Sequence, residues 1–319
     1  MGARPAVDTS TLPALLEERG FEEPTGGFLA YVIAMRFEDG RARIVAERRY
    51  DVEGTSEEAS TWNPASTVKL YAAIGALRRI HALGYDRQAT LTFRGTGEPQ
   101  TWTLEALVQA AIGPSDNLAY DYLVVFSGFD WLHERLLTPE NGFERTALRI
   151  PYDKGRWTRL GFSESLRDSP DITVEQDGRT TELPAAVGDA EVACDQGSCT
   201  TPAELGETLR RVMLQDLLPD EERLGLRADD LTLLRELLAS PRERGTEVVH
   251  ELRPSFSADA VFFHKAGYAD EWFSDNVYID DPALDRTWVV VLAGRPGRSC
   301  LDRVAELLGE LLVGGRLDP

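Results

Sequence analysis

Apolar residues follow two different periodicities in different parts of this chain of 319 residues. Patterns typical of β-strands lie toward both ends, whereas apolar residues in the middle recur at helical spacing. Residues 28–37 and 42–50 flank an Asp-Gly turn and predict a hairpin. Further strands are predicted at 260–264, 272–280 and 287–293, after 245. These patterns require an antiparallel sheet built from both chain ends, with a helical part inserted between them.

Helical spacing predicts a series of helices between the two groups of strands and one helix after them. They cover 66–83, 103–113, 117–126, 130–137, 202–215, 229–239 and 300–313. The sequence therefore predicts an α/β chain of the α+β kind, in which helices flank the sheet. Residues 1–60 and 245–319 form the sheet lobe, and 61–244 form an all-helical lobe.

The stretch 154–199 interrupts the helical pattern. It is rich in Gly, Ser and Asp, and Asp177-Gly178 predicts a hairpin within it. We expect a long loop insertion there, because loops of this length usually carry function or disorder. The active site is expected in the cleft between the two lobes.

Charge and hydropathy exclude several partners. The net charge is −20, which argues against nucleic acid or an anionic lipid surface. No run of 18 apolar residues exists, so no membrane span is predicted. The first residues lack the apolar core of a signal peptide, so either the mature form is present or the protein stays inside the cell.

The spacing of cysteine and histidine residues allows one disulfide and predicts no metal site. Cys194 and Cys199 flank a turn-like tetrapeptide that could close a small disulfide or leave both thiols free, and Cys300 is left over. His133-Glu134 has no second histidine four residues after the first, so no metal site is predicted. We also expect no cofactor.

Lysine is rare in this chain, which has three lysines and 31 arginines. Lys69 follows Ser66 by three residues, so a helix starting near Ser66 would place hydroxyl and amine on one face. A desolvated lysine can lose its proton and act as a base, whereas arginine cannot. The alternative reading is that Ser66 only caps a helix.

Two further short motifs accompany this Ser-x-x-Lys pattern. Ser115-Asp116-Asn117 follows a helical run, and Lys265-Ala266-Gly267 follows an apolar strand. Asn117 could merely cap a helix and Lys265 could be an ordinary strand-end charge. The tripeptide recurs as Ser274-Asp275-Asn276 inside a strand pattern, so context selects the first copy.

The three motifs together resemble those of the penicillin-recognising serine enzymes, most closely the class A β-lactamases. The run 103–117 is similar to the helix that leads into the Ser-Asp-Asn motif of that family, and Thr200-Thr201-Pro202 is similar to another helix start. The resemblance spans about 28–315. It implies the same two-lobed architecture and a periplasmic or secreted location.

The resemblance also assigns roles to the matching residues. Ser66 would form the acyl-enzyme, Lys69 would accept its proton, and Ser115 would pass a proton to the leaving nitrogen. Asn117 and Lys265 would bind the amide and the carboxylate of the substrate. The backbone N–H groups of Ser66 and Tyr268 would form the oxyanion hole, while Gly267 would let the substrate approach the strand.

Two departures from the family pattern bear on turnover. Ile150 stands before Pro151, where class A enzymes carry the glutamate that activates the deacylating water. Glu140, Glu144 and Asp153 are nearby carboxylates, but none matches the motif. Ala266 replaces the usual Thr or Ser, which removes a hydrogen bond to a substrate carboxylate worth about 1.5–3 kcal/mol.

The sequence therefore predicts a serine hydrolase that forms an acyl-enzyme with a β-lactam or a related cyclic or peptide amide. A penicillin-binding D,D-peptidase, an esterase or an acyl transferase with slow deacylation is an alternative. A module that binds peptidoglycan-like ligands without turnover is a further one.

Overall fold

A computed structural model describes residues 4–50, 62–192, 194, 197–240 and 248–318. The chain divides into two compact units. Unit 1 comprises 1–67, 200–224 and 238–319, and unit 2 comprises 68–199 and 225–237. The predicted lobe boundaries near 60 and 245 lie outside the described residues.

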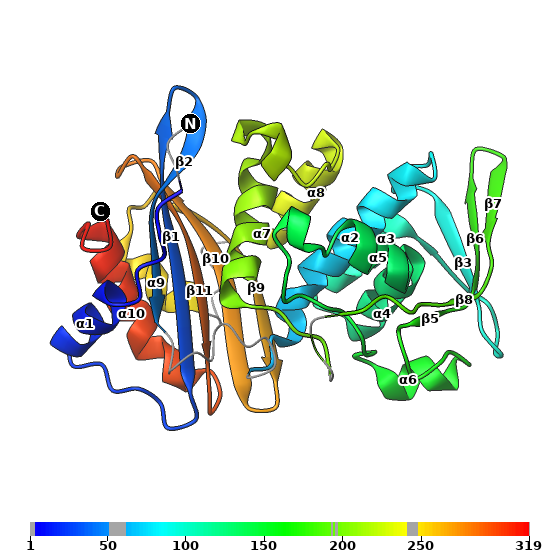
Figure 1. Ribbon diagram of the computed structural model, residues 1–319, viewed down its shortest axis with the longest axis horizontal. Helices are drawn as coiled ribbons and strands as arrows, with labels where there is room; N and C mark the ends of the chain where they lie inside the picture. The colour runs from blue at the N-terminus through cyan, green and yellow to red at the C-terminus, as the bar shows by residue number, and fades with distance from the viewer. Residues whose placement is uncertain (1–3, 51–61, 193, 195–196, 241–247, 319) are drawn as a thin grey trace. The chain divides into compact units, whose positions relative to one another are not determined.

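Unit 1 contains a five-stranded antiparallel sheet in the order β2-β1-β11-β10-β9 (Figure 1). The strands come from both chain ends, which confirms the predicted architecture. Their bounds are Phe28–Glu38 for β1, Arg41–Tyr50 for β2, Val261–Ala269 for β9, Trp272–Asp281 for β10 and Arg286–Gly294 for β11.

The hairpin of β1 and β2 turns at Asp39 and Gly40, whose φ angles are 50° and 72°. A type I′ turn needs positive φ at both central residues, which Asp-Gly adopts at low cost. The turn residues therefore fix the register of the first two strands, as the sequence predicts.

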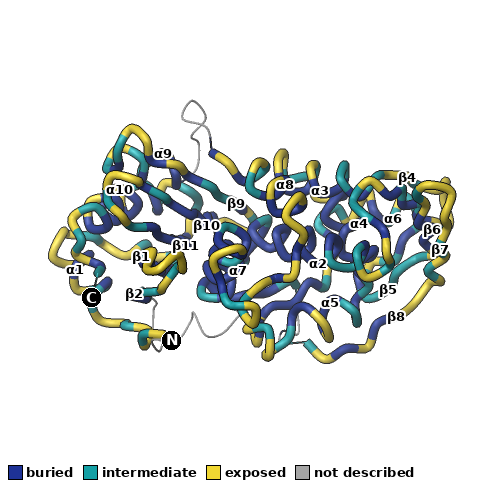
Figure 2. The backbone as a smooth tube through the Cα atoms, turned by 90° about the horizontal axis from the view of Figure 1, so that it is seen from above, coloured by how far each residue is buried: buried dark blue, intermediate teal, exposed yellow. Residues whose placement is uncertain are grey.

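Both faces of this sheet are covered by helices. Ala30, Val32 and Ala34 join the core formed with α1 (Thr11–Glu18), α9 (Val248–Leu252) and α10 (Ser299–Val313). The opposite face, with Tyr31 and Ile33, contacts Gly206 of α7 (Pro202–Leu214). Alternate residues of a strand point to opposite faces of the sheet. A nearly continuous apolar strand such as β1 therefore needs helices packed on both faces. Figure 2 shows the resulting buried strands.

Helix α7 therefore belongs to unit 1, whereas the sequence analysis placed it in the helical lobe. Thr201 caps its N-terminus by accepting a hydrogen bond from the N–H of Glu204 at 3.1 Å, and Pro202 occupies the first turn. The sequence predicted this helix correctly as local structure. Its apolar face packs on a sheet whose strands are distant in sequence, which local spacing does not reveal.

Unit 2 is built on packed helices. They are α2 (Lys69–Ala82), α3 (Leu104–Ile112), α4 (Asn117–Ser127), α5 (Phe129–Arg135), α6 (Lys154–Arg159) and α8 (Ala228–Leu238). Residues of α2 are buried on nearly every side, which is typical of a central helix.

Unit 2 also contains strands, so the prediction of an all-helical lobe was wrong in this respect. Its four-stranded sheet has the order β4-β3-β6-β7, with β3 at Thr90–Arg94, β4 at Gln100–Thr103, β6 at Asp171–Gln176 and β7 at Arg179–Leu183. Two further short strands, β5 (Asp168–Ser169) and β8 (Ala186–Val187), pair with each other. The predicted hairpin at Asp177-Gly178 joins β6 to β7, and β6 pairs with β3 from an earlier part of the chain. Such short strands carry a weak periodic signal.

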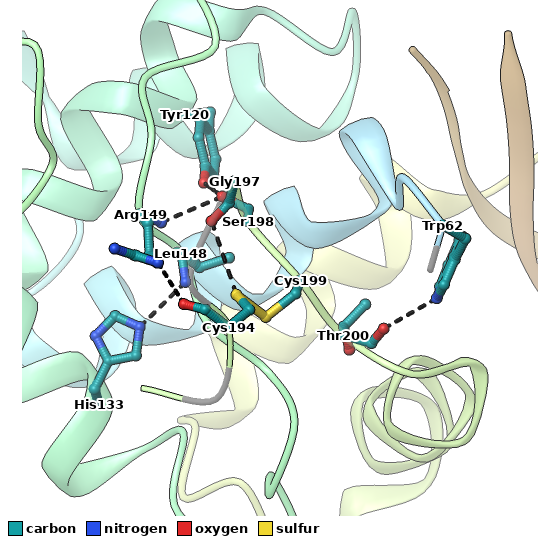
Figure 3. The surroundings of a disulfide bond; sticks show 10 residues. All are labelled: Trp62, Tyr120, His133, Leu148, Arg149, Cys194, Gly197, Ser198, Cys199 and Thr200. Atoms are coloured by element: carbon teal, nitrogen blue, oxygen red, sulfur yellow. Dashed lines mark hydrogen bonds between the residues drawn. A yellow bond between two sulfur atoms is a disulfide. The ribbon is translucent and has the colours of Figure 1, made fainter. Parts of the chain in front are cut away.

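Cys194 and Cys199 form a disulfide, which the sequence left open (Figure 3). The C-terminal end of the disulfide loop forms hydrogen bonds with residues 147–149. Ala147 and Cys199 exchange two backbone hydrogen bonds of 2.9 Å each, and Ser198 accepts one from the N–H of Arg149 at 3.3 Å. No described helix is long and apolar enough to cross a membrane.

Candidate active site

Ser66 lies in a short 3-10 helix, Ala65–Val68, that continues directly into α2. Its predicted alternative role as a helix cap is absent, because Val68 occupies the N-cap position of α2 and no side chain caps that end. The preceding residue, Ala65, has φ 47°. A positive φ at alanine is strained and persists only where surrounding contacts hold it.

Several contacts within unit 1 hold this strained segment. Asn63 Oδ1 accepts a hydrogen bond from the Ala65 N–H at 2.9 Å, and Asn63 Nδ2 donates to Asp270 at 2.7 Å. The Pro64 carbonyl accepts hydrogen bonds from the hydroxyls of Thr67 at 2.6 Å and Ser274 at 3.3 Å. The segment 63–67 is thus fixed to β10 and to the turn between β9 and β10.

Gly267 makes the closest approach to this segment. A Cβ atom added there would lie 2.7 Å from the Ser66 nitrogen and 2.8 Å from the Pro64 oxygen. The sequence analysis assigned the missing side chain to substrate access. The structure shows a further constraint, because the space that a side chain would take is occupied by the backbone of residues 64–66. Gly267 is therefore needed to bring Ser66 against β9.

The remaining residues of the Lys-Ala-Gly motif lie on β9, an edge strand of the sheet. Lys265 is only 6% exposed and its Nζ donates to the Ala266 carbonyl at 3.1 Å. It therefore is not a strand-end surface charge. Ala266 packs against the apolar core of unit 1, and the Tyr268 side chain is 64% exposed.

Lys69, the first residue of α2, is fully buried in unit 2. Its Nζ donates to the Ser115 carbonyl at 2.5 Å and to Asn117 Oδ1 at 2.6 Å, and it lies 3.2 Å from Ser115 Oγ. The structure therefore brings Lys69 together with two predicted site residues, Ser115 and Asn117, that lie 46 and 48 positions later in the sequence.

The conformation of the Ser-Asp-Asn motif explains this convergence. Ser115 has φ 62°, and Asp116 caps α4 by accepting a hydrogen bond from the Ala119 N–H at 2.7 Å. Asn117 is consequently not the cap, and its side chain is available to Lys69. The second copy of the motif lies in β10, where Asn276 donates to the Leu205 carbonyl at 2.8 Å and Asp275 contacts His264. The first copy, and not the second, therefore lies against Lys69.

Asp121 is a buried carboxylate beside Lys69 that the sequence analysis missed. It accepts hydrogen bonds from the N–H groups of Tyr152 at 2.7 Å and Asp153 at 3.0 Å. Burial raises the pKa of Asp121 to about 7, while these two hydrogen bonds and the nearby Lys69 charge oppose the rise. Its position four residues after Asn117, on the same helix face, was the available signal.

The segment that Asp121 holds corresponds to the expected position of the deacylating glutamate. Ile150 is 43% exposed, and Asn117 Nδ2 donates to the Tyr152 carbonyl at 3.4 Å. Asp153 caps α6 by accepting from the Arg156 N–H at 3.1 Å, whereas Glu140 and Glu144 are exposed. Of these three carboxylates, Asp153 lies in the segment that Asp121 holds.

The disulfide supports the same region of unit 2. Ser198, next to Cys199, lies 3.2 Å from the hydroxyl of Tyr120 on α4 (Figure 3). The Tyr120 ring in turn packs on Tyr152 with a centroid distance of 4.4 Å. This chain of contacts connects the covalent loop to the segment beside Lys69.

The five-stranded antiparallel sheet with helices on both faces is the fold of the class A β-lactamases and of PBP-A. A model of the β-lactamase enzyme family matches residues 50–311, so the chain belongs to that family. A search of curated proteins gave no significant match.

Solved structures share the fold at low sequence identity. One is a class A β-lactamase from Bacteroides cellulosilyticus DSM 14838, with 12% identity, a TM-score of 0.56 and coverage of 97% of this chain and 100% of that chain. A β-lactamase from Burkholderia vietnamiensis has 17% identity, a TM-score of 0.57 and 97% coverage of both chains. A mutant of PBP-A, in an acyl-enzyme complex with penicillin G, has 15% identity, a TM-score of 0.58 and coverage of 98% and 99%.

Proposed function

We propose that this protein is a serine hydrolase that forms an acyl-enzyme on Ser66 with a β-lactam or a related cyclic or peptide amide. The observation that carries the proposal is the buried Lys69 Nζ, held by Ser115 and Asn117 at the start of the helix that follows Ser66. A lysine in such a position serves as a base if its amine is neutral.

The hydrogen bonds of Lys69 are compatible with a neutral amine. Such an amine donates to the Ser115 carbonyl and to Asn117 Oδ1, and its lone pair can accept a proton from a hydroxyl. A second cation, Lys265, would disfavour protonation and attract a substrate carboxylate. The reaction requires both groups to act on one substrate molecule.

In the proposed acylation, Ser66 Oγ attacks the carbonyl carbon and its proton moves to Lys69. The N–H groups of Ser66 and Tyr268 stabilise the negative oxygen that develops. The carbon–nitrogen bond then breaks, and the proton passes from Lys69 through the Ser115 hydroxyl to the leaving nitrogen. Asn117 orients the amide of the substrate. Water later hydrolyses the ester.

Slow deacylation is the expected departure from a typical class A enzyme. Ile150 cannot activate water, and the Asp121 carboxylate already accepts two backbone hydrogen bonds. These observations favour the second candidate function, a penicillin-binding D,D-peptidase, esterase or acyl transferase. The disulfide fits a periplasmic or secreted location, because such bonds persist in oxidising compartments.

Intact-mass measurements over time test the proposal. The protein is incubated with penicillin G, a cephalosporin and an activated ester, beside a Ser66→Ala variant. A Ser66-dependent adduct supports acylation, and peptide mapping must place it on Ser66. Rapid loss of the adduct indicates a hydrolase, whereas a lasting adduct indicates the peptidase class. No adduct with any of the three compounds, with all three remaining intact in solution, would favour a non-catalytic binding module.

A further inference from the structure

A separate cavity of about 290 Å³ lies in unit 2. Its walls come from α2, from the start of α5 and from the inserted stretch between 167 and 188. None of the predicted active-site residues lines it. Ligand pockets in proteins begin at about 300 Å³, so this cavity suits a small molecule.

Most of the cavity wall is apolar. Phe129 and Trp131 contribute aromatic rings, and Ile172, Pro170 and Pro184 contribute aliphatic surface from the inserted stretch. Flat apolar walls of this kind favour an aromatic body in the ligand, because ring stacking adds to the hydrophobic gain.

Two arginines, Arg79 and Arg167, also line the cavity. The Arg79 guanidinium lies 5.6 Å from the ring centroid of Trp131, and that of Arg167 lies 4.4 Å from Phe129. A guanidinium that faces a ring keeps its N–H groups in its own plane, where they can donate to an anion. The same residues therefore offer stacking surfaces and cationic donors.

The cavity wall carries two arginines and one carboxylate, Asp130, so its net charge is positive. Within the described part of the chain, neither arginine forms an ion pair, and the buried Nε of Arg79 has no hydrogen-bond partner. Arg167 donates one hydrogen bond, to the Gly188 carbonyl at 3.3 Å. An anionic ligand would therefore meet the outer N–H groups of these guanidinium groups, which are stronger donors to a charged acceptor than to a neutral one.

Asp130, the carboxylate in the wall, is already engaged. One of its oxygens accepts hydrogen bonds from the N–H groups of Asp189 at 2.8 Å and Ala190 at 2.9 Å. These bonds close the end of the inserted stretch onto α5. Gly188 permits this closure, because a Cβ there would lie 2.6 Å from the Cβ of Phe129. The inserted stretch thus completes the cavity.

We propose that this cavity is a second binding site, which takes a small aromatic monocarboxylate. The aromatic body packs against Trp131, Pro170 and Pro184, and the carboxylate accepts hydrogen bonds from Arg79 and Arg167. This site is independent of the proposed acylation at Ser66.

Isothermal titration calorimetry of the full protein tests the proposal, with phenylacetate as the probe and phenylacetamide as its neutral counterpart. We expect phenylacetate to bind and phenylacetamide to bind at least about tenfold more weakly, the change that follows from losing about 1.4 kcal/mol. Arg79→Gln and Arg167→Gln should each weaken phenylacetate binding by a similar factor. Arg159→Gln removes the same charge from an exposed position of the same unit and should leave binding unchanged.

Two further variants distinguish binding in this cavity from binding elsewhere on the protein. Ala186→Trp places a large side chain at an exposed wall position and should abolish binding without unfolding the protein. Lys265→Met removes the cation expected to bind substrate carboxylates, and binding should persist. Absence of heat with millimolar phenylacetate, equal binding of the amide, or loss of binding in Lys265→Met would overturn the proposal.

Discussion

The Nζ of Lys69 lies 2.6 Å from Oδ1 of Asn117, a residue 48 positions later in the chain. This hydrogen bond joins the start of α2 to the start of α4 inside unit 2. Because Lys69 is fully buried, the protonation state of its amine depends on its hydrogen-bond partners and on nearby charges. The expected effects of substitution follow from that dependence.

Replacing Lys69 with arginine should abolish acylation while the protein still folds. A guanidinium stays protonated at any physiological pH and therefore cannot accept the proton of Ser66. The larger side chain should cost about 1–3 kcal/mol of stability through overpacking. Intact mass after incubation with penicillin G measures the first effect and chemical denaturation measures the second. Acylation by the folded variant would remove Lys69 as the base.

Asp121→Asn should extend acylation to lower pH. The ionised carboxylate stabilises a positive charge on Lys69, so its removal favours the neutral amine. The acid limb of the acylation rate against pH should shift downward. An unchanged or upward-shifted limb would contradict the proposed coupling between these two residues.

The same variant should change how stability depends on pH. The pKa of Asp121 is raised by burial to about 7 from 3.8, so the folded state binds its proton more tightly than the unfolded state does. The associated stability is fully present below about pH 4 and is lost as pH rises through 7. The loss is at most on the order of 4 kcal/mol, since one pKa unit corresponds to about 1.4 kcal/mol. Asp121→Asn should flatten this part of the profile in denaturant titrations between pH 4 and 8.

Gly267→Ala should lower the acylation rate at least about 100-fold. The new Cβ would collide with the backbone of Pro64 and Ser66, which must move and carry the nucleophile with it. Gly155→Ala is the matched control, because the nearest atom to its Cβ would be the end of the Arg159 side chain, 3.6 Å away. The control should keep its rate. Equal rates for both variants would show that the approach of β9 to Ser66 is unimportant.

Removing the disulfide by Cys194→Ser with Cys199→Ser should destabilise the protein by about 2 kcal/mol, the loop-entropy value for such a short loop. The effect should appear in denaturant unfolding without reductant. Cys300→Ser, which changes the remaining cysteine, should leave stability nearly unchanged. Equal stability of the double variant and the unmodified protein would contradict a structural role for the bond.

Ile150→Glu should accelerate release of the acyl group. Ile150 is half-exposed, so a glutamate is tolerated there, and a carboxylate at this position would activate water if the family resemblance extends to this loop. The time course of adduct mass after a single dose of penicillin G measures the change. Adduct loss at the original rate would show that this position does not substitute for the family glutamate.

Local sequence patterns were sufficient for several elements. The β1–β2 hairpin follows from Asp39-Gly40, whose residue types suit positive φ, and α3 and α4 follow from apolar spacing. Strand β9 was predicted too short, since it continues through Lys265-Ala266-Gly267 to Ala269. Alanine and glycine have low strand propensity, and pairing with β10 overrides it.

The sequence by itself determined the class of fold and the candidate residues Ser66, Lys69, Ser115, Asn117 and Lys265, because motif spacing and periodicity are local properties. The tertiary structure decided which groups surround Lys69, why Gly267 is required and that Asp121 is buried beside a lysine. It also decided that unit 2 contains a sheet and a cavity walled by the inserted stretch. These features depend on packing between segments far apart in the chain, where burial and close approach set the energies.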